Sequence, residues 1–232
     1  MKNVDYAGMF VKEFHEVLEE NPTAWVPIGL LEWHGEHIAL GCDFVIGQEI
    51  CRLLARTYGG IVLPPTYFSS PGFSGYEGTI DFPREVASPI LTALLKQLEK
   101  VGFKTVVLLS SHGGSVQEKM VAKAADDYRQ EGSVRVLVVF PGALFGTMES
   151  PPHATVREAA VLQHLHPEAV DVSRFTPGKE YEAAYLDLPR YRDHPPRPWR
   201  IGTVDVREAP LADIADQFLE KVVKGVGDLL KA

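Results

Sequence analysis

The chain has 232 residues and a formal net charge of −8 at pH 7. Hydrophobic residues make up 45% of it and charged residues 23%, which is typical of a globular protein and excludes a disordered or fibrous one. Because nucleic-acid binding needs clustered lysine and arginine, and these residues are scattered here, we expect no nucleic-acid partner.

The sequence shows no sign of a membrane span or an export signal. No apolar run reaches the roughly 18 residues that a span requires, so we expect no membrane partner. The stretch from Met1 to Tyr6 lacks the apolar core of a secretory signal, and a cytoplasmic location is expected.

The first half of the chain alternates helical and strand-like patterns. Apolar residues at three- and four-residue spacing predict helices, and continuous apolar runs predict buried strands. Helices are expected over residues 6–18, 46–56 and 88–100, with Ser88 as a cap, and strands over 25–31, 60–64 and 104–109. The long irregular stretch 65–83 either lines a site or is a surface excursion.

The second half continues the alternation. Helices are predicted over residues 116–129, 155–165 and 211–230, a strand over 135–140 that Pro141 ends, and an irregular segment over 175–200. Strands that alternate with helices favour a mainly parallel sheet between helical layers. We therefore predict an α/β protein with a three-layer α/β/α architecture, formed as one domain over residues 1–232.

Potential metal ligands follow two of the predicted strands. Glu32 and His34 come directly after the first strand, two residues apart, and Asp43 follows nine residues later. His112 follows the strand that ends at residue 109. Because parallel strands end at the same sheet edge, these side chains should meet, and a mixed nitrogen and oxygen set suits one or two ions such as Zn²⁺, Mn²⁺ or Fe²⁺.

Other residues near these segments have competing interpretations. Glu158 could complete the metal site or merely favour the amino end of its helix, and His153 is an ordinary loop histidine unless it joins the same site. His37 could be a ligand, a substrate contact or an outer partner of a ligand. Cys42 adjoins Asp43 and is a conceivable soft ligand, but a structural thiol is the favoured interpretation.

Three motifs in chain order resemble those of the creatininase-family amidohydrolases. The run Glu32-Trp33-His34-Gly35-Glu36-His37, followed by Asp43, is similar to the family's Glu-x-His-Gly-x-His and Asp motif. Ser111-His112-Gly113-Gly114 resembles Gly-His-Gly-Gly-Asn, and His153-Ala154 with Glu158 resembles His-Ala-Gly-Glu-x-Glu-Thr-Ser. Each motif alone is weak, but three in the same order are specific.

The resemblance implies a dinuclear metal centre in a homo-oligomer, often a hexamer. The metal positions carried over are Glu32, His34, Asp43 as the bridging ligand, His112 and Glu158. We further expect His153 to be the proton shuttle, and His37, Tyr76, Gly113 and Gly114 to contact the substrate. Creatininase has a metal-binding glutamate at the place of Gly114, so the resemblance leaves Glu158 as the candidate for the fifth ligand.

The expected activity is metal-dependent hydrolysis of a cyclic or other non-peptide C–N bond in a small amide, through a hydroxide held between the ions. Deformylation of a formamide and peptide cleavage stay open. A non-catalytic metal-binding role also stays open, because Ala159-Ala160 replaces Thr-Ser in the third motif. A serine hydrolase is disfavoured, because Gly72 to Tyr76 does not complete the Gly-x-Ser-x-Gly motif.

Overall fold

The structure is a computed structural model that describes residues 3–145, 153–188 and 198–232. The helices are α1 (Val11–Glu20), α2 (Cys42–Tyr58), α3 (Arg84–Lys100), α4 (Ser115–Arg129), α5 (Pro141–Phe145), α6 (Val156–Leu165) and α7 (Leu211–Lys231). The strands are β1 (Thr23–Ile28), β2 (Ile61–Val62), β3 (Thr105–Ser110), β4 (Arg135–Val139), β5 (Glu180–Tyr181) and β6 (Trp199–Arg200). Short 3₁₀ helices cover Tyr6–Gly8, Pro167–Ala169 and Val172–Arg174.

Four parallel strands form the central sheet in the order β2-β1-β3-β4. Strands β1 and β3 pair along their whole length, from Thr23 opposite Thr105 to Ile28 opposite Ser110. They therefore end level with each other, and the segments that follow them start from the same edge of the sheet.

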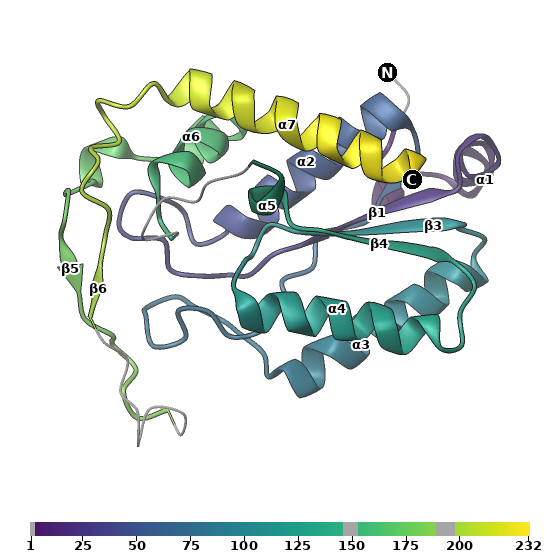
Figure 1. Cartoon of the computed structure of the whole chain (residues 1–232), viewed down its shortest axis with the longest axis horizontal. Helices are drawn as coiled ribbons and strands as arrows, with labels where there is room; N and C mark the ends of the chain where they lie inside the picture. The colour runs from purple at the N-terminus through teal and green to yellow at the C-terminus, as the bar shows by residue number, and fades with distance from the viewer. Residues whose placement is uncertain (1–2, 146–152, 189–197) are drawn as a thin grey trace.

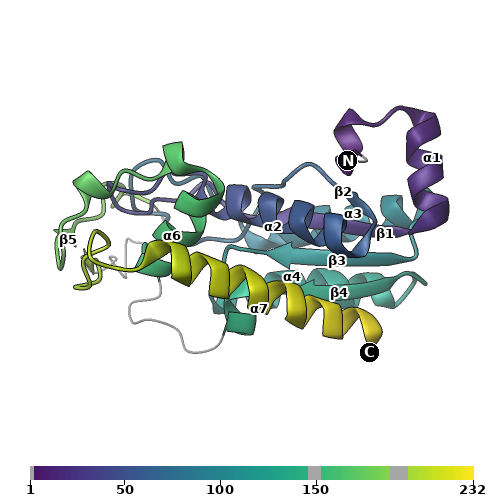
Figure 2. The same cartoon turned by 90° about the horizontal axis from the view of Figure 1, so that it is seen from above.

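Helices cover both faces of this sheet, as Figures 1 and 2 show. Alternate strand residues point to opposite faces, so Trp25 packs in the cluster formed with α2, α6 and α7, whereas Ala24 and Val26 pack with α3 and α4. Both faces of the strands are buried, which explains their continuous apolar runs. The α/β fold with three layers is confirmed.

The structure differs from the predicted elements at several boundaries. Helix α3 begins at Arg84, so Ser88 lies buried inside the helix and is not its cap. Pro141 starts the short helix α5 after β4, because proline is tolerated at the first helical position. Tyr6–Gly8 forms a separate 3₁₀ turn before α1.

The segment expected to be irregular over 175–200 contains a small second sheet. Strands β5 and β6 pair antiparallel, with Glu180 opposite Arg200 and Tyr181 opposite Trp199. Residues 189–197 of this segment lie outside the described residues. Within the described part of the chain, no helix is both long enough and apolar enough to cross a membrane.

Candidate functional site

Gly29, just after β1, allows the start of α2 to approach the end of the strand. A Cβ atom at Gly29 would lie 2.3 Å from the backbone nitrogen of Phe44, which no larger residue could accommodate. This close approach brings Asp43, in the first turn of α2, beside the side chains that follow β1. The sheet edge and the helix start thus converge on one point.

The carboxylate centre consists of Glu32, Asp43 and His112, whose potential ligand atoms lie within 4.8 Å of one another. The Nδ1 atom of His112 is 3.3 Å from Glu32 Oε2 and 3.2 Å from Asp43 Oδ2. All three side chains are buried. The other oxygen of Glu32 accepts a hydrogen bond from the Phe73 amide at 2.7 Å, which fixes the orientation of the carboxylate.

The cysteine centre consists of His34, Cys42 and Asp43, whose potential ligand atoms also lie within 4.8 Å of one another. Nε2 of His34 is 3.3 Å from Asp43 Oδ1. Nδ1 of the same ring lies 3.0 Å from the backbone oxygen of Glu32, to which it donates a proton, so Nε2 is the ring nitrogen that faces Asp43. Asp43 therefore directs one oxygen to His34 and the other to His112.

His153 lies beside both centres. Its Nδ1 is 3.9 Å from Glu32 Oε2, and it forms a third group of potential ligands with Glu32 and His34. Its Nε2 contacts the backbone oxygen of Trp33 at 2.5 Å, and its ring stacks on Phe73 with 3.8 Å between centroids. His153 thus lies at the same sheet edge as the two centres.

The buried charges at this edge depend on one another. Burial lowers the pKa of His34 and of His112, but nearby Asp43 and Glu32 raise both to about 10. Burial raises the pKa of Asp43, but the charged His34 and His112 lower it below its usual range. Without metal, protons on the imidazoles thus supply the positive charge that the carboxylates require.

The same residues fit divalent cations. His34 Nε2 and Asp43 Oδ2 are buried and lie 3.3 and 3.2 Å from an oppositely charged group, but neither forms a hydrogen bond of good geometry. Buried polar atoms without good hydrogen bonds are costly, and here they are the atom types that Zn²⁺, Mn²⁺ and Fe²⁺ coordinate. The donor set of carboxylate oxygens and imidazole nitrogens can therefore hold metal in place of protons.

Glu158 is placed differently from the other predicted ligands. Its Oε2 accepts a hydrogen bond from the Thr155 amide at 3.0 Å, and the Thr155 hydroxyl accepts from the Glu158 amide at 3.4 Å. This reciprocal pair caps α6. Glu158 lines a cavity of about 50 Å³ together with Asp43, but it belongs to none of the three ligand groups. Its role as a ligand stays a prediction.

The predicted substrate contacts fall into two environments. Tyr76 stacks on Trp33 with 4.6 Å between ring centroids. His37 is buried edge-on against Phe175, and neither of its ring nitrogens has a hydrogen bond. Gly113 and Gly114 are exposed, and a Cβ atom at either would meet no atom within 4 Å. Their contacts with substrate also stay predictions.

Sequence reasoning missed most of the aromatic cluster, which we define as Trp33, Phe73, Tyr76, Tyr181 and Trp199. Phe73 packs perpendicular to Trp199 at 4.8 Å and parallel to His153. The length of the loop 65–83 left open whether it lines a site or is a surface excursion, and no pattern singled out Phe73. The short strands that carry Tyr181 and Trp199 had no sequence signal.

A comparison with known families identifies the family of this chain. The creatininase family model, described as creatinine amidohydrolase, matches residues 7–230. The chain belongs to the creatininase family. The expected hydrolase acting on C–N bonds is thereby confirmed.

Individual relatives are distant. Creatinine amidohydrolase of Pseudomonas putida is 21% identical over 234 residues, covering 89% of this chain and 87% of the relative. The mycofactocin precursor peptide peptidase of Mycolicibacterium smegmatis is 26% identical over 181 residues, covering 74% and 68%.

Two solved creatininase structures share the fold of the whole chain. The one described as "Creatininase Mn" has a TM-score of 0.78 at 18% identity and covers 99% of this chain and 98% of that one. A mutant creatininase of "Zn-Zn type" has a TM-score of 0.78 at 19% identity and covers 100% and 98%.

Proposed function

We propose that this family member is a metal-dependent amidohydrolase that cleaves a cyclic or other non-peptide C–N bond in a small molecule. Two divalent cations, Zn²⁺, Mn²⁺ or Fe²⁺, would be held by Glu32, His34, Asp43 and His112, with Glu158 as the fifth ligand. The observation that carries this proposal is the position of Asp43, which directs one oxygen to each of two buried imidazoles.

The cations would supply Lewis acidity, which polarises a carbonyl oxygen and lowers the pKa of a water molecule. The chain itself orients the ligands. The backbone oxygen of Glu32 fixes the His34 ring, and the Phe73 amide holds the Glu32 carboxylate. Such outer partners raise metal affinity because the ligands need not reorganise when the ion binds.

His153 is placed to transfer the proton. Burial, together with the charge on His34, lowers the pKa of His153 to about 4, so its imidazole is neutral near pH 7. The Trp33 carbonyl accepts the Nε2 proton and leaves the Nδ1 lone pair directed to the site. Nδ1 would take the proton from the tetrahedral intermediate and deliver it to the leaving nitrogen.

The aromatic cluster would form the wall of the substrate pocket. Trp33 and Tyr76 present stacked flat rings, which suit a planar amide or a small ring. The peptidase relative supports peptide cleavage as the second candidate, with His37, Gly113 and Gly114 as further substrate contacts. We also propose a homo-oligomer, the hexamer included.

Metal analysis and activity measurements test this function. Purified protein should contain one to two divalent ions per chain, hydrolyse a member of a panel of lactams, formamides and short peptides, and lose activity to a chelator. Full activity after removal of all metal would overturn the proposal. Hydrolysis of peptides alone would select the second candidate.

A matched pair of histidine variants tests the proton transfer. His153→Ala should lower kcat by roughly 100- to 10,000-fold with metal content unchanged. His164→Ala is the control, because His164 lies on α6 and faces Asp216 at 3.6 Å, half exposed. Equal rates for the two variants would remove His153 from the mechanism.

A further inference from the structure

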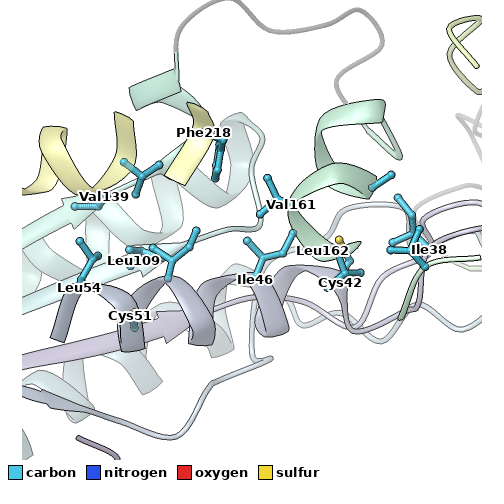
Figure 3. Close-up of a cluster of buried hydrophobic side chains, with 14 of the residues drawn as sticks. Ile38, Cys42, Ile46, Cys51, Leu54, Leu109, Val139, Val161, Leu162 and Phe218 are labelled. Carbon is cyan, nitrogen blue, oxygen red and sulfur yellow. The ribbon is translucent and has the colours of Figure 1, made fainter. Parts of the chain in front are cut away.

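The two cysteines of this chain offer an internal comparison. Both are free, both are fully buried and both lie on α2. Figure 3 shows Cys42 at the end of the helix near Leu162 of α6, and Cys51 farther along the same helix. Only Cys42 belongs to a group of potential metal ligands in the described part of the chain.

We infer that the Cys42 thiolate is a metal ligand, and that the cysteine centre of His34, Cys42 and Asp43 is a zinc-selective position. This inference rests on the proposed function, because it names a ligand and a metal preference within the same dinuclear site. It does not depend on which amide is cleaved.

The distances allow coordination. Ligand atoms around a tetrahedral zinc ion lie about 3.3 to 3.8 Å apart, given zinc–sulfur and zinc–nitrogen bonds of about 2.3 and 2.1 Å. The ligand atoms of His34, Cys42 and Asp43 lie within 4.8 Å of one another, so small side-chain movements would complete the site. His34 Nε2, which has no hydrogen bond, is the nitrogen available to the ion.

The surroundings of the two sulfur atoms also differ. The Cys42 sulfur lies within 4.8 Å of an Asp43 oxygen, and Asp43 also shares the carboxylate centre with Glu32, whereas Cys51 belongs to no ligand group among the described residues. The Cys42 sulfur therefore adjoins a concentration of negative charge. A divalent ion would neutralise this concentration of negative charge, and the thiol would release its proton to solvent as the metal–sulfur bond forms.

A thiolate would make the two centres chemically unequal. The carboxylate centre offers two carboxylates and one imidazole, a set that Mn²⁺, Fe²⁺ and Zn²⁺ all accept. The cysteine centre would add a soft sulfur, which favours Zn²⁺ over Mn²⁺. Gly114, which carries no side chain, contributes no ligand atom to either centre.

Cobalt substitution tests the inference with a readout independent of turnover. Metal-stripped protein reloaded with Co²⁺ should bind two ions and show the near-ultraviolet thiolate-to-cobalt charge-transfer band. Cys42→Ala should lose the band. Its affinity for the second ion should fall by more than the roughly 10- to 100-fold that loss of an outer partner of a ligand would cause. Cys51→Ala should keep both ions and the band.

A measurement on the unmutated chain covers the case in which Cys42→Ala fails to fold. With ¹¹³Cd²⁺ in both centres, one resonance should show the downfield shift of a thiolate ligand. Mn²⁺ alone should fill one position per chain, and Zn²⁺ should fill two. Two cadmium resonances typical of nitrogen and oxygen ligands would overturn the inference.

The outcomes separate this inference from the proposed function. Two ions, chelator-sensitive hydrolysis and no charge-transfer band would overturn the role of Cys42 and leave the amidohydrolase intact. A chain that binds no divalent metal would overturn both.

Discussion

The two ends of the central sheet differ in whether their buried polar groups form hydrogen bonds. At the amino end, the indole of Trp25 donates to the Gly59 carbonyl at 2.8 Å, and Asn21 donates to the Tyr58 carbonyl at 2.7 Å. The Tyr58 hydroxyl donates to the Val223 carbonyl at 2.9 Å. A cavity of about 520 Å³ opens there, but no described side chain that lines it has a buried polar atom without a partner.

At the carboxyl end, buried atoms are left without hydrogen bonds on His34, His37, Asp43 and His112. The cavity beside Asp43 has a volume of only about 50 Å³. Cavity size would therefore select the wrong end of the molecule. A folded chain normally pairs its buried polar groups, so the end where it fails to do so is the end that requires a ligand.

Removal of Asp43 should have the largest effect on stability and metal binding at the carboxyl end of the sheet. In metal-free protein, Asp43→Ala leaves the two facing imidazoles without their shared carboxylate, which we expect to cost about 3 to 5 kcal/mol of unfolding free energy. Metal binding and turnover should both disappear. Denaturant unfolding and metal analysis measure these effects. Asp216→Ala, at an exposed ion pair, should change stability by less than about 0.5 kcal/mol.

Gly29→Ala should separate the end of β1 from α2. The new Cβ would lie 2.3 Å from the Phe44 nitrogen, and such overpacking costs about 1 to 3 kcal/mol. Metal affinity should fall as well, because Asp43 would move with α2. Gly202→Ala is the control, since its Cβ would meet no atom within 4 Å. Calorimetric metal titration of a stable Gly29→Ala variant with unchanged affinity would contradict this account.

The pH dependence of stability should report on His37, a buried histidine without hydrogen bonds at the carboxyl end of the sheet. Burial, with the charge on His34, lowers the pKa of His37 from 6.5 to about 4. The unfolded chain then binds more protons than the folded one between these values, so stability falls as pH falls through this window. The His37 shift alone should contribute a loss of roughly 1 to 2 kcal/mol between pH 7 and 5 in metal-free protein, so His37→Phe should lose less stability than the unmutated chain by about this amount. Equal losses in urea titrations would show that His37 is not the group responsible.

The smallest effect is expected at the amino end. Tyr58→Phe removes the hydrogen bond to the Val223 carbonyl and should cost about 1 kcal/mol. Metal content and turnover should stay at their original values, because this end of the sheet has no part in the site. A lower metal content in this variant would show that the two ends are coupled.

The sequence predicted that Glu32, His34 and His112 converge, because parallel topology brings the ends of β1 and β3 to one sheet edge. Asp43 was expected with them, and in the structure the close approach of α2 at Gly29 brings it there. The register in which β1 and β3 end level with each other comes from the structure. Helix α2 was expected from residue 46 and instead begins at Cys42, so both Cys42 and Asp43 lie in its first turn. The first turn of the helix thus reaches the site, four residues earlier than the apolar pattern indicated.

The path of the loop 65–83 was beyond sequence reasoning. Buried Gln117 on α4 donates to the hydroxyls of Ser69 and Ser110 and accepts from the amide of Ser70. These hydrogen bonds connect the loop to the end of β3. A single glutamine in a helix forms no sequence pattern from which they could be predicted. The pairing of β5 with β6 was missed for a similar reason, since two-residue strands carry no periodicity.

The tryptophans divide between the two ends of the sheet. Trp25 is held at the amino end, whereas Trp33 and Trp199 belong to the aromatic cluster, with the Trp33 ring 5.9 Å from that of His153. The sequence contains only these three. Two of the three tryptophans therefore adjoin the site, and the third supplies a constant background when tryptophan is excited selectively. Intrinsic emission should report the arrival of a metal ion or substrate without any attached label.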